Sequence, residues 1–508
     1  MRYWQEPEIT GISKIYNDFS FKLPLNSKSL VTAALFFIFA LIFCNRTLAN
    51  ENINLELMRL NKCYTLLTKS PLAQTHPLWQ SVKDGNQSGT SACMEIFNKA
   101  RLNNNGYLID QGTEAKAILS TITQWHINFL NFDNDYHFTS SNTYDVIDRL
   151  GPIHYLSRAL LQEVPFSESV TLNYGLLAKR DSEVTRVYSV LPRKRSNTAN
   201  GAEIDYKMKF WQGSPANNEP NFNPPLVETG RLYAITHDQS PLILQNGQGH
   251  GIDNGAGKNM KHHFGGGLLG SQAFLLSHIP KWKFRSDGAI NVHRLLGKSI
   301  LEDVLCRSGP YVRSVDVLNE INLNSSIDFR RGIACMTCHI GQDNLAALTR
   351  NLFVIGSNNL RYVSRYGVRF VADTQDQKLP TTPLPKQEAN PDFYKTQASG
   401  KLVFRGFNGK LINIPVENLQ QLGEAIASTD DYYACTVKKY YKILTGIDVN
   451  LDDLGDLNSP ALTAEATEYR NKVIQLALKL KETQNARLII QDIINSMEFI
   501  MLPQQEAQ

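Results

Sequence analysis

Residues 334–344 read ACMTCHIGQDN and contain Cys335, Cys338 and His339 in the pattern C-x-x-C-H. With seven cysteines and eleven histidines in 508 residues, chance would produce this spacing about 0.002 times per chain. A structural zinc site would need a fourth ligand and usually a second pair of ligands, which the sequence lacks. A redox-active dithiol is expected within a βαβ pattern, and none flanks the motif. The motif therefore predicts that two thiols and one imidazole serve a single bound group.

The spacing is typical of covalent haem attachment. Two thiols on one helical turn can add across the two vinyl groups of a porphyrin, and the adjacent histidine then lies beneath the iron. We therefore expect one haem c, held by Cys335 and Cys338, with His339 as the proximal axial ligand of the iron. No residue is predicted to be catalytic.

The N-terminal region predicts export. Residues 30–44 (LVTAALFFIFALIFC) form an uncharged apolar run that follows Lys22 and Lys28 and precedes Arg46. Such a run matches a secretory signal and is shorter than the ~20 residues that span a bilayer. Thr47 and Ala49 have small side chains at the third and first positions before an expected cleavage site, which predicts cleavage after Ala49. An uncleaved N-terminal anchor is the alternative. We expect a periplasmic or extracellular protein with no other membrane span.

Export changes how the remaining cysteines are interpreted, because thiols outside the cytoplasm are usually paired or used. Once the motif and the N-terminal segment are set aside, four disulfide candidates remain, namely Cys63, Cys93, Cys306 and Cys435. Four thiols allow three pairings. The local pair Cys63–Cys93 is the natural one, which leaves the other two cysteines to face each other.

The charge balance does not favour nucleic acid as a partner. The formal net charge is +4, and loss of residues 1–49, which hold five basic and three acidic residues, lowers it to +2. A chain with so small an excess of positive charge has no strong field for a polyanion. Its length of 508 residues indicates more than one structural unit.

Hydrophobic periodicity divides the chain into four segments and predicts a fold that is mainly α with some irregular β. Residues 1–49 are the signal sequence or anchor, and residues 50–165 are a helical N-terminal domain with helices expected at 53–67, 91–102, 114–130 and 143–163. Residues 166–290 are a mixed, loop-rich region with strands expected at 185–191, 204–211 and 231–237. Residues 291–508 are a helical domain that carries the haem-attachment motif, with helices expected at 291–307, 416–444 (broken at Ser-Thr-Asp-Asp), 463–482 and 485–500.

The segment CMTCHIGQDNLAALTRNL (335–352) resembles the haem segment of planctomycete-type cytochrome c domains. There an acid follows the motif by four residues, then proline, an apolar residue and a small residue. Asp343, Leu345 and Ala346 match this pattern, whereas Asn344 stands where proline is usual. STDDYYACTVKKYYKILTG (428–446) and LIIQDIINSMEFI (488–500) are similar to later segments of the same family. The resemblance covers the C-terminal region and implies one haem and electron transfer, and residues 50–165 resemble no family.

The ligand on the other face of the iron is left open. Small cytochromes c usually supply a downstream methionine, and the only methionines after His339 are Met497 and Met501, in the predicted terminal helix. Upstream, several histidines and a methionine lie near a glycine cluster or on the helix at 291–307. The candidate sixth ligands are His250, Met260, His262, His263, His293 and Met497.

The expected function is that of an exported mono-haem c-type cytochrome that transfers electrons between redox partner proteins not identified by the sequence. A strong sixth ligand favours outer-sphere electron transfer, whereas an open position would admit peroxide or another small ligand. The alternatives are a peroxidase-like haem enzyme with an open sixth position, and a surface partner-binding protein in which the haem is accessory. Electron transfer is favoured over catalysis.

Overall fold

The structure is a computed structural model, and it describes thirteen stretches of the chain. The predicted signal segment and the candidate ligands His250, Met260 and His262 lie outside them. The described residues are 52–131, 150–178, 188–194, 204–210, 226–235, 242–244, 258–259, 263–277, 290–355, 370–373, 397–455, 459 and 461–501.

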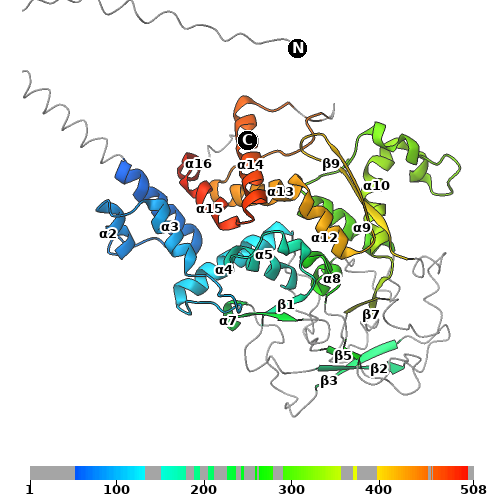
Figure 1. Ribbon diagram of the computed structural model, residues 1–508, viewed down its shortest axis with the longest axis horizontal. Helices are drawn as coiled ribbons and strands as arrows, with labels where there is room; N and C mark the ends of the chain where they lie inside the picture. Colours follow the sequence, from blue (N-terminus) through cyan, green and yellow to red (C-terminus); the bar gives the residue numbers. More distant parts are fainter. Residues whose placement is uncertain are drawn as a thin grey trace, which may run out of the picture.

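Helices from the two ends of the chain pack against each other. Figure 1 shows the blue and cyan helices beside the orange and red ones, and α15 contacts both α3 and α5 while α12 contacts α6. The N-terminal helices are 52–68, α2 (Pro77–Lys83), α3 (Gly89–Asn98), α4 (Thr113–Phe129), α5 (Gly151–Leu161) and α6 (Glu168–Thr171). The C-terminal helices are α12 (Leu419–Ser428), α13 (Asp430–Thr445), α14 (Ala464–Thr483), α15 (Ala486–Asn495) and α16 (Met497–Ile500).

The junction between α12 and α13 explains the break predicted at Ser-Thr-Asp-Asp. Thr429 has an extended backbone, and its side chain accepts a hydrogen bond from the Tyr432 amide as the N-cap of α13. Asp430 and Asp431 follow in the first turn, where carboxylates suit the positive end of the helix dipole. Gly446, with a φ of 84°, ends the helix in the left-handed conformation that glycine adopts without strain.

Helix α13 is buried along most of its surface and joins the two groups of helices. Tyr440 is completely buried, and its hydroxyl lies 2.8 Å from Nε2 of His126 on α4. The other ring nitrogen of His126 lies 3.0 Å from the Ser157 hydroxyl on α5. One hydrophobic core accordingly runs from Leu60 to Ile500. The described helices of residues 50–165 and 291–508 thus share a core, and the division of the chain into domains stays a prediction.

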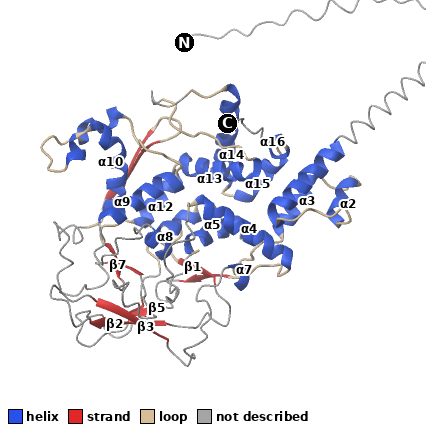
Figure 2. Cartoon of the chain, turned by 180° about the vertical axis from the view of Figure 1, so that it is seen from behind, coloured by secondary structure: helices blue, strands red, loops and turns tan. Residues whose placement is uncertain are grey.

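The strands form small separate sheets. Leu402 of β9 pairs with Ile414 of β10 in an antiparallel hairpin, and β9 packs against α10. Figure 2 shows β2, β3 and β5 together on the side of the molecule away from α14 and α16. The pairs are β1 (Gly175–Ala178) with β4 (Leu232–Ile235), β7 (Leu352–Ile355) with β8 (Phe370–Asp373), and β9 (Gly400–Arg405) with β10 (Leu411–Val416). The four-stranded sheet has the order β3 (Ile204–Phe210), β2 (Tyr188–Lys194), β5 (Leu242–Leu244) and β6 (Lys258–Asn259). The prediction of a mainly α fold with some irregular β is confirmed.

The helix predicted at 291–307 changes character along its length. It begins as α9 (Ile290–Ser299), continues as the π-helical segment η4 (Ile300–Val304) and stops at Cys306, whose φ of 53° is left-handed. A π segment inserts an extra residue into the turn and shifts which side chains face the core. The other short helices are α7 (Leu226–Thr229), η3 (Gly267–Gly270), α8 (Gln272–Ser277), η5 (Ser314–Glu320) and η6 (Asp328–Arg331), and the longer helix α10 spans Ile333–Leu348.

Two disulfides lie within the described residues, and they are the pairs favoured from the sequence. The Cα atoms are 5.8 Å apart in Cys63–Cys93 and 5.2 Å apart in Cys306–Cys435. The first joins the helix at 52–68 to α3, and the second joins the end of η4 to α13. Within the described stretches, no helix is both long enough and apolar enough to cross a bilayer.

We predict that His126 makes the fold sensitive to acid. Burial lowers the pKa of His126 to about 3, whereas the unfolded chain has the ordinary value of about 6.5. Because the unfolded state binds a proton that the folded state does not, the free energy of unfolding should fall on acidification, by about 1.4 kcal/mol per pH unit between pH 6 and pH 4.5. Urea denaturation across this range should show that His126→Gln removes this part of the slope. An equal slope in both proteins would contradict the assignment.

Candidate functional site

Helix α10 carries the C-x-x-C-H motif in its first turns. Cys335, Cys338 and His339 share one face, because residues three and four apart are neighbours on a helix. The opposite face, with Met336 and Ile340, is buried. Cys335 is exposed, Cys338 is half-buried, and both are free thiols. The motif is therefore anchored from behind and open in front.

The segment before α10 holds the helix in place through backbone hydrogen bonds. The amides of Tyr311 and Val312 both donate to the carbonyl of Thr337, at 3.1 and 3.4 Å, and the Arg405 amide of β9 donates to the Tyr311 carbonyl at 2.7 Å. The 311–312 backbone therefore bridges α10 and β9. This contact fixes the turn of α10 that lies between the two cysteines.

The Cys338 sulfur lies close to the backbone of this segment. A Cβ atom placed on Gly309 would lie 3.1 Å from the Cys338 sulfur and 3.7 Å from the Tyr311 ring, so the backbone approaches the thiol as closely as glycine allows. Burial raises the pKa of Cys338. Burial also raises the pKa of Tyr311 to about 12, and its hydroxyl donates to Glu302 at 3.3 Å and accepts from Gln342 at 3.2 Å.

His339 packs against an aromatic ring and has one nitrogen without a partner. Its imidazole is stacked on Phe329 of η6, with ring centroids 4.1 Å apart and planes 19° from parallel. Nδ1 is buried and has no hydrogen-bond partner among the described residues. A carboxylate oxygen of Asp343 lies 3.9 Å from it, which is beyond hydrogen-bond range.

Apolar side chains are exposed on the segments that come before α10 and at its first residue. Val315 and Leu318 lie on η5, which packs against α10, while Ile327 precedes η6 and Ile333 is the first residue of α10. Exposed apolar side chains that gather at one place commonly mark a binding surface. We name this set the apolar rim, and its exposed fractions are Val315 68%, Leu318 55%, Leu323 74%, Ile327 41% and Ile333 40%.

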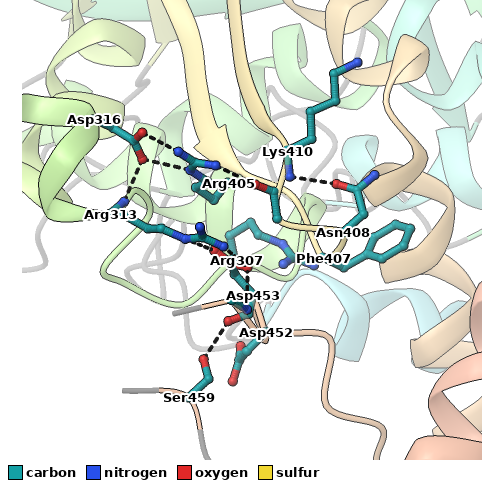
Figure 3. Close-up of polar contacts among 12 residues, drawn as sticks. Arg307, Arg313, Asp316, Arg405, Phe407, Asn408, Lys410, Asp452, Asp453 and Ser459 are labelled. Carbon is teal, nitrogen blue, oxygen red and sulfur yellow. Dashed lines mark hydrogen bonds and ion pairs between the residues drawn. The ribbon is translucent and has the colours of Figure 1, made fainter. Parts of the chain in front are cut away.

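Ion pairs fix η5, and with it part of the apolar rim. Figure 3 shows Arg405 of β9 directed at Asp316 of η5, with Nε 2.8 Å from the carboxylate. Arg313 donates from Nε and Nη2 to the two oxygens of Asp453, each at 2.7 Å. The Arg405 hydrogen bonds hold the pKa of Asp316 below its ordinary value. Paired arginines and carboxylates of this geometry hold neighbouring segments at a fixed spacing.

These residues fit a haem c. Two free thiols and an imidazole project from one open helical face, the imidazole has a buried nitrogen that needs an acceptor, and apolar side chains are exposed on neighbouring segments. Cys335 and Cys338 would form the thioethers, His339 would bind the iron, and the rim would cover apolar porphyrin surface.

The structure describes two of the six candidate sixth ligands in full. His263 accepts a hydrogen bond from the Gly265 amide at Nδ1, at 2.9 Å, and Nε2 lies 2.6 Å from the Gly267 carbonyl, so both of its ring nitrogens are engaged. Burial lowers the pKa of His263 to about 4. Met497 is half exposed on α16, which lies far from α10 in both views. Neither is placed beside the motif as an iron ligand would be.

The other four candidates stay predictions. His250, Met260 and His262 lie outside the described residues. His293 belongs to α9, which packs against α10, and its side chain is also outside the description.

Comparisons with protein-family models, with curated proteins and with solved structures found no match. In the stretches that the structure describes, no group of three or more His, Cys, Asp or Glu side chains is arranged to hold a metal ion. The interpretation of the site therefore depends on its own residues.

Sequence reasoning missed the residues that surround the motif in space. Tyr311, Phe329 and Arg294 come from three separate elements, and no periodic pattern relates them to Cys338 or His339. Arg294 directly follows His293, which is one of the candidate sixth ligands. Only the packing of α9, η6 and the 311–312 backbone against α10 brings them together.

We predict that opening Cys306–Cys435 damages the site, whereas opening Cys63–Cys93 does not. In the chain-entropy treatment, loops of 129 and 30 residues correspond to ~4.9 and ~3.6 kcal/mol of stability. In protein produced without haem, where Cys338 is a free thiol, the double serine variant of Cys306 and Cys435 should lose more stability in urea denaturation. It should also expose Cys338 to alkylation, because Gly309 and Tyr311 follow Cys306 closely. The matched double variant of Cys63 and Cys93 should leave Cys338 labelling unchanged. Equal labelling of Cys338 in the two variants would contradict this prediction.

Proposed function

We propose that the protein is an exported mono-haem c-type cytochrome that carries electrons between redox partners. The observation that carries this proposal is the open face of α10, where two free thiols and His339 lie together above a buried helix face. Buried thiols, or thiols already bonded in disulfides, would have argued against haem attachment. The resemblance of residues 335–352 to planctomycete-type cytochrome c domains supports the same conclusion.

Each motif residue has a defined role in this proposal. The thiol of Cys335 and that of Cys338 would each add across a vinyl group, so that a carbon–sulfur bond would form and the thiol hydrogen would go to the other vinyl carbon. His339 provides the proximal nitrogen. The haem, when bound, supplies a one-electron couple, and the residues around it set how readily it accepts the electron. Gly309 and Tyr311 hold the Cys338 sulfur in position.

Export is supported by the cysteine usage of the described chain. Cys63–Cys93 and Cys306–Cys435 are disulfides, and structural disulfides form and persist in oxidising compartments. Together with the uncharged apolar run at 30–44, this supports a periplasmic or extracellular location, with an N-terminal anchor as the alternative. The redox partners are proteins that neither the sequence nor the structure identifies.

The proposal predicts haem that stays bound to the unfolded chain. The full-length protein, produced in a host with haem-attachment machinery, should give a band in a denaturing gel stained for haem peroxidase activity. The double variant with Cys335→Ala and Cys338→Ala should lose the stain, because the thioethers are the only bonds between haem and chain that survive denaturation. A double variant with alanine at Cys63 and Cys93 is the matched control and should keep it. An unstained wild-type band would refute the proposal.

The proposal also predicts that the apolar rim covers porphyrin surface. Leu318→Asp places a charge where apolar contact is expected and should reduce the fraction of chains that carry haem, measured as haem absorbance per polypeptide. Leu478→Asp is the matched control, because Leu478 is 48% exposed on α14 and Leu318 is 55% exposed on η5, while α14 lies away from α10 (Figure 1). Equal haem content in the two variants would show that the rim does not face the haem.

A further inference from the structure

Four side chains are arranged in a ring on one side of the motif. Phe329 is stacked on the His339 imidazole, and the Arg294 guanidinium of α9 lies 4.9 Å from the centre of the same phenyl ring. Arg294 also binds Asp343 through two hydrogen bonds, from Nε at 2.6 Å and from Nη2 at 3.2 Å. The ring is completed by Asp343, whose Oδ1 lies 3.9 Å from Nδ1 of His339.

The missing interaction in this ring is a hydrogen bond between Nδ1 of His339 and Asp343. An imidazole that binds iron through Nε2 carries its proton on Nδ1, and that N–H needs an acceptor when it is buried. Nδ1 is buried and has no partner among the described residues. Asp343 is four residues further along α10, on the same face, and a shift of about 1 Å would bring its oxygen to hydrogen-bond distance.

We propose that Asp343 is a positioning residue that accepts the Nδ1 proton of His339 in a hydrogen bond once haem is attached, with Arg294 limiting the strength of that bond. The inference rests on the proposed function. A carboxylate acceptor orients the imidazole and makes it a more electron-rich ligand, which stabilises ferric over ferrous iron. Arg294 withdraws charge from the carboxylate and opposes this effect. The pair Arg294–Asp343 therefore adjusts the reduction potential of the haem through its hydrogen bond to His339.

The arrangement of the charged groups supports this assignment. Glu302 is directed at Tyr311 and Lys298, on the Cys338 side of the helix, so it is not an alternative acceptor for His339. Asp328 of η6 is paired with Arg331. The acceptor recorded near Nδ1 is Asp343, and the stacked Phe329 ring covers the face of the imidazole beside it.

The test uses the full-length, haem-loaded protein labelled with ¹⁵N-histidine. In the wild type, the Nδ1 proton of His339 should exchange slowly with solvent in NMR spectra, and in Asp343→Asn it should exchange about tenfold faster because the charged acceptor is lost. The midpoint potential of Asp343→Asn should rise by about 59 mV, which corresponds to a tenfold change in the equilibrium constant of a one-electron reduction. Arg294→Gln leaves the carboxylate in place without its cation and should lower the potential.

A matched control separates the hydrogen bond from the field of a nearby charge. Glu302→Gln removes a carboxylate on the Cys338 side of the helix without touching His339, so its exchange rate should stay at the wild-type value even if the potential moves. The inference is overturned if Asp343→Asn leaves the exchange rate unchanged, or if Arg294→Gln and Asp343→Asn shift the potential in the same direction. A wild-type protein without haem would instead remove the proposed function, and the inference with it.

Discussion

Two adjacent residues, Cys306 and Arg307, tie the segment before α10 to α13. Cys306 is bonded to Cys435, and the Arg307 guanidinium lies 3.2 Å from the carboxylate of Asp431. Asp431 and Cys435 are one helical turn apart, so both contacts use one face of α13. Both charges are buried, and burial raises the pKa of Asp431 even beside a guanidinium. Because loss of either partner would leave a buried charge unpaired, the path of residues 308–312 depends on this double tie.

The candidate site depends on that path. Residues 309–312 supply the close backbone approach to Cys338 and the two amides that bind the Thr337 carbonyl. Beyond them, Arg313 and Asp316 connect η5 to the rest of the protein through Asp453 and Arg405 (Figure 3). The back of α10 is thus rigidly packed, while its front presents thiols, an imidazole and exposed apolar side chains. This contrast supports the proposed covalent attachment of a planar group.

Local sequence patterns predicted the helices well, because apolar residues at helical spacing and caps act over a few residues. The expected helix at 114–130 corresponds to α4, and the break at Ser-Thr-Asp-Asp corresponds to the Thr429 cap. The π-helical segment η4 was not predicted, since it depends on how Ile300–Val304 pack in the core rather than on a local signal. The shared core was likewise not predicted, because contacts such as His126 with Tyr440 join residues 314 positions apart.

The sequence by itself determined the spacing of Cys335, Cys338 and His339, which a helix converts into one face, and the set of cysteines available for disulfides. Only the tertiary structure decided what surrounds that face. Phe329, Arg294 and Tyr311 reach the motif from elements whose positions depend on long-range packing, a disulfide and buried ion pairs. The spacing of the motif is local and can therefore be read from the sequence, whereas the surroundings of the motif arise between segments that meet only in the folded protein.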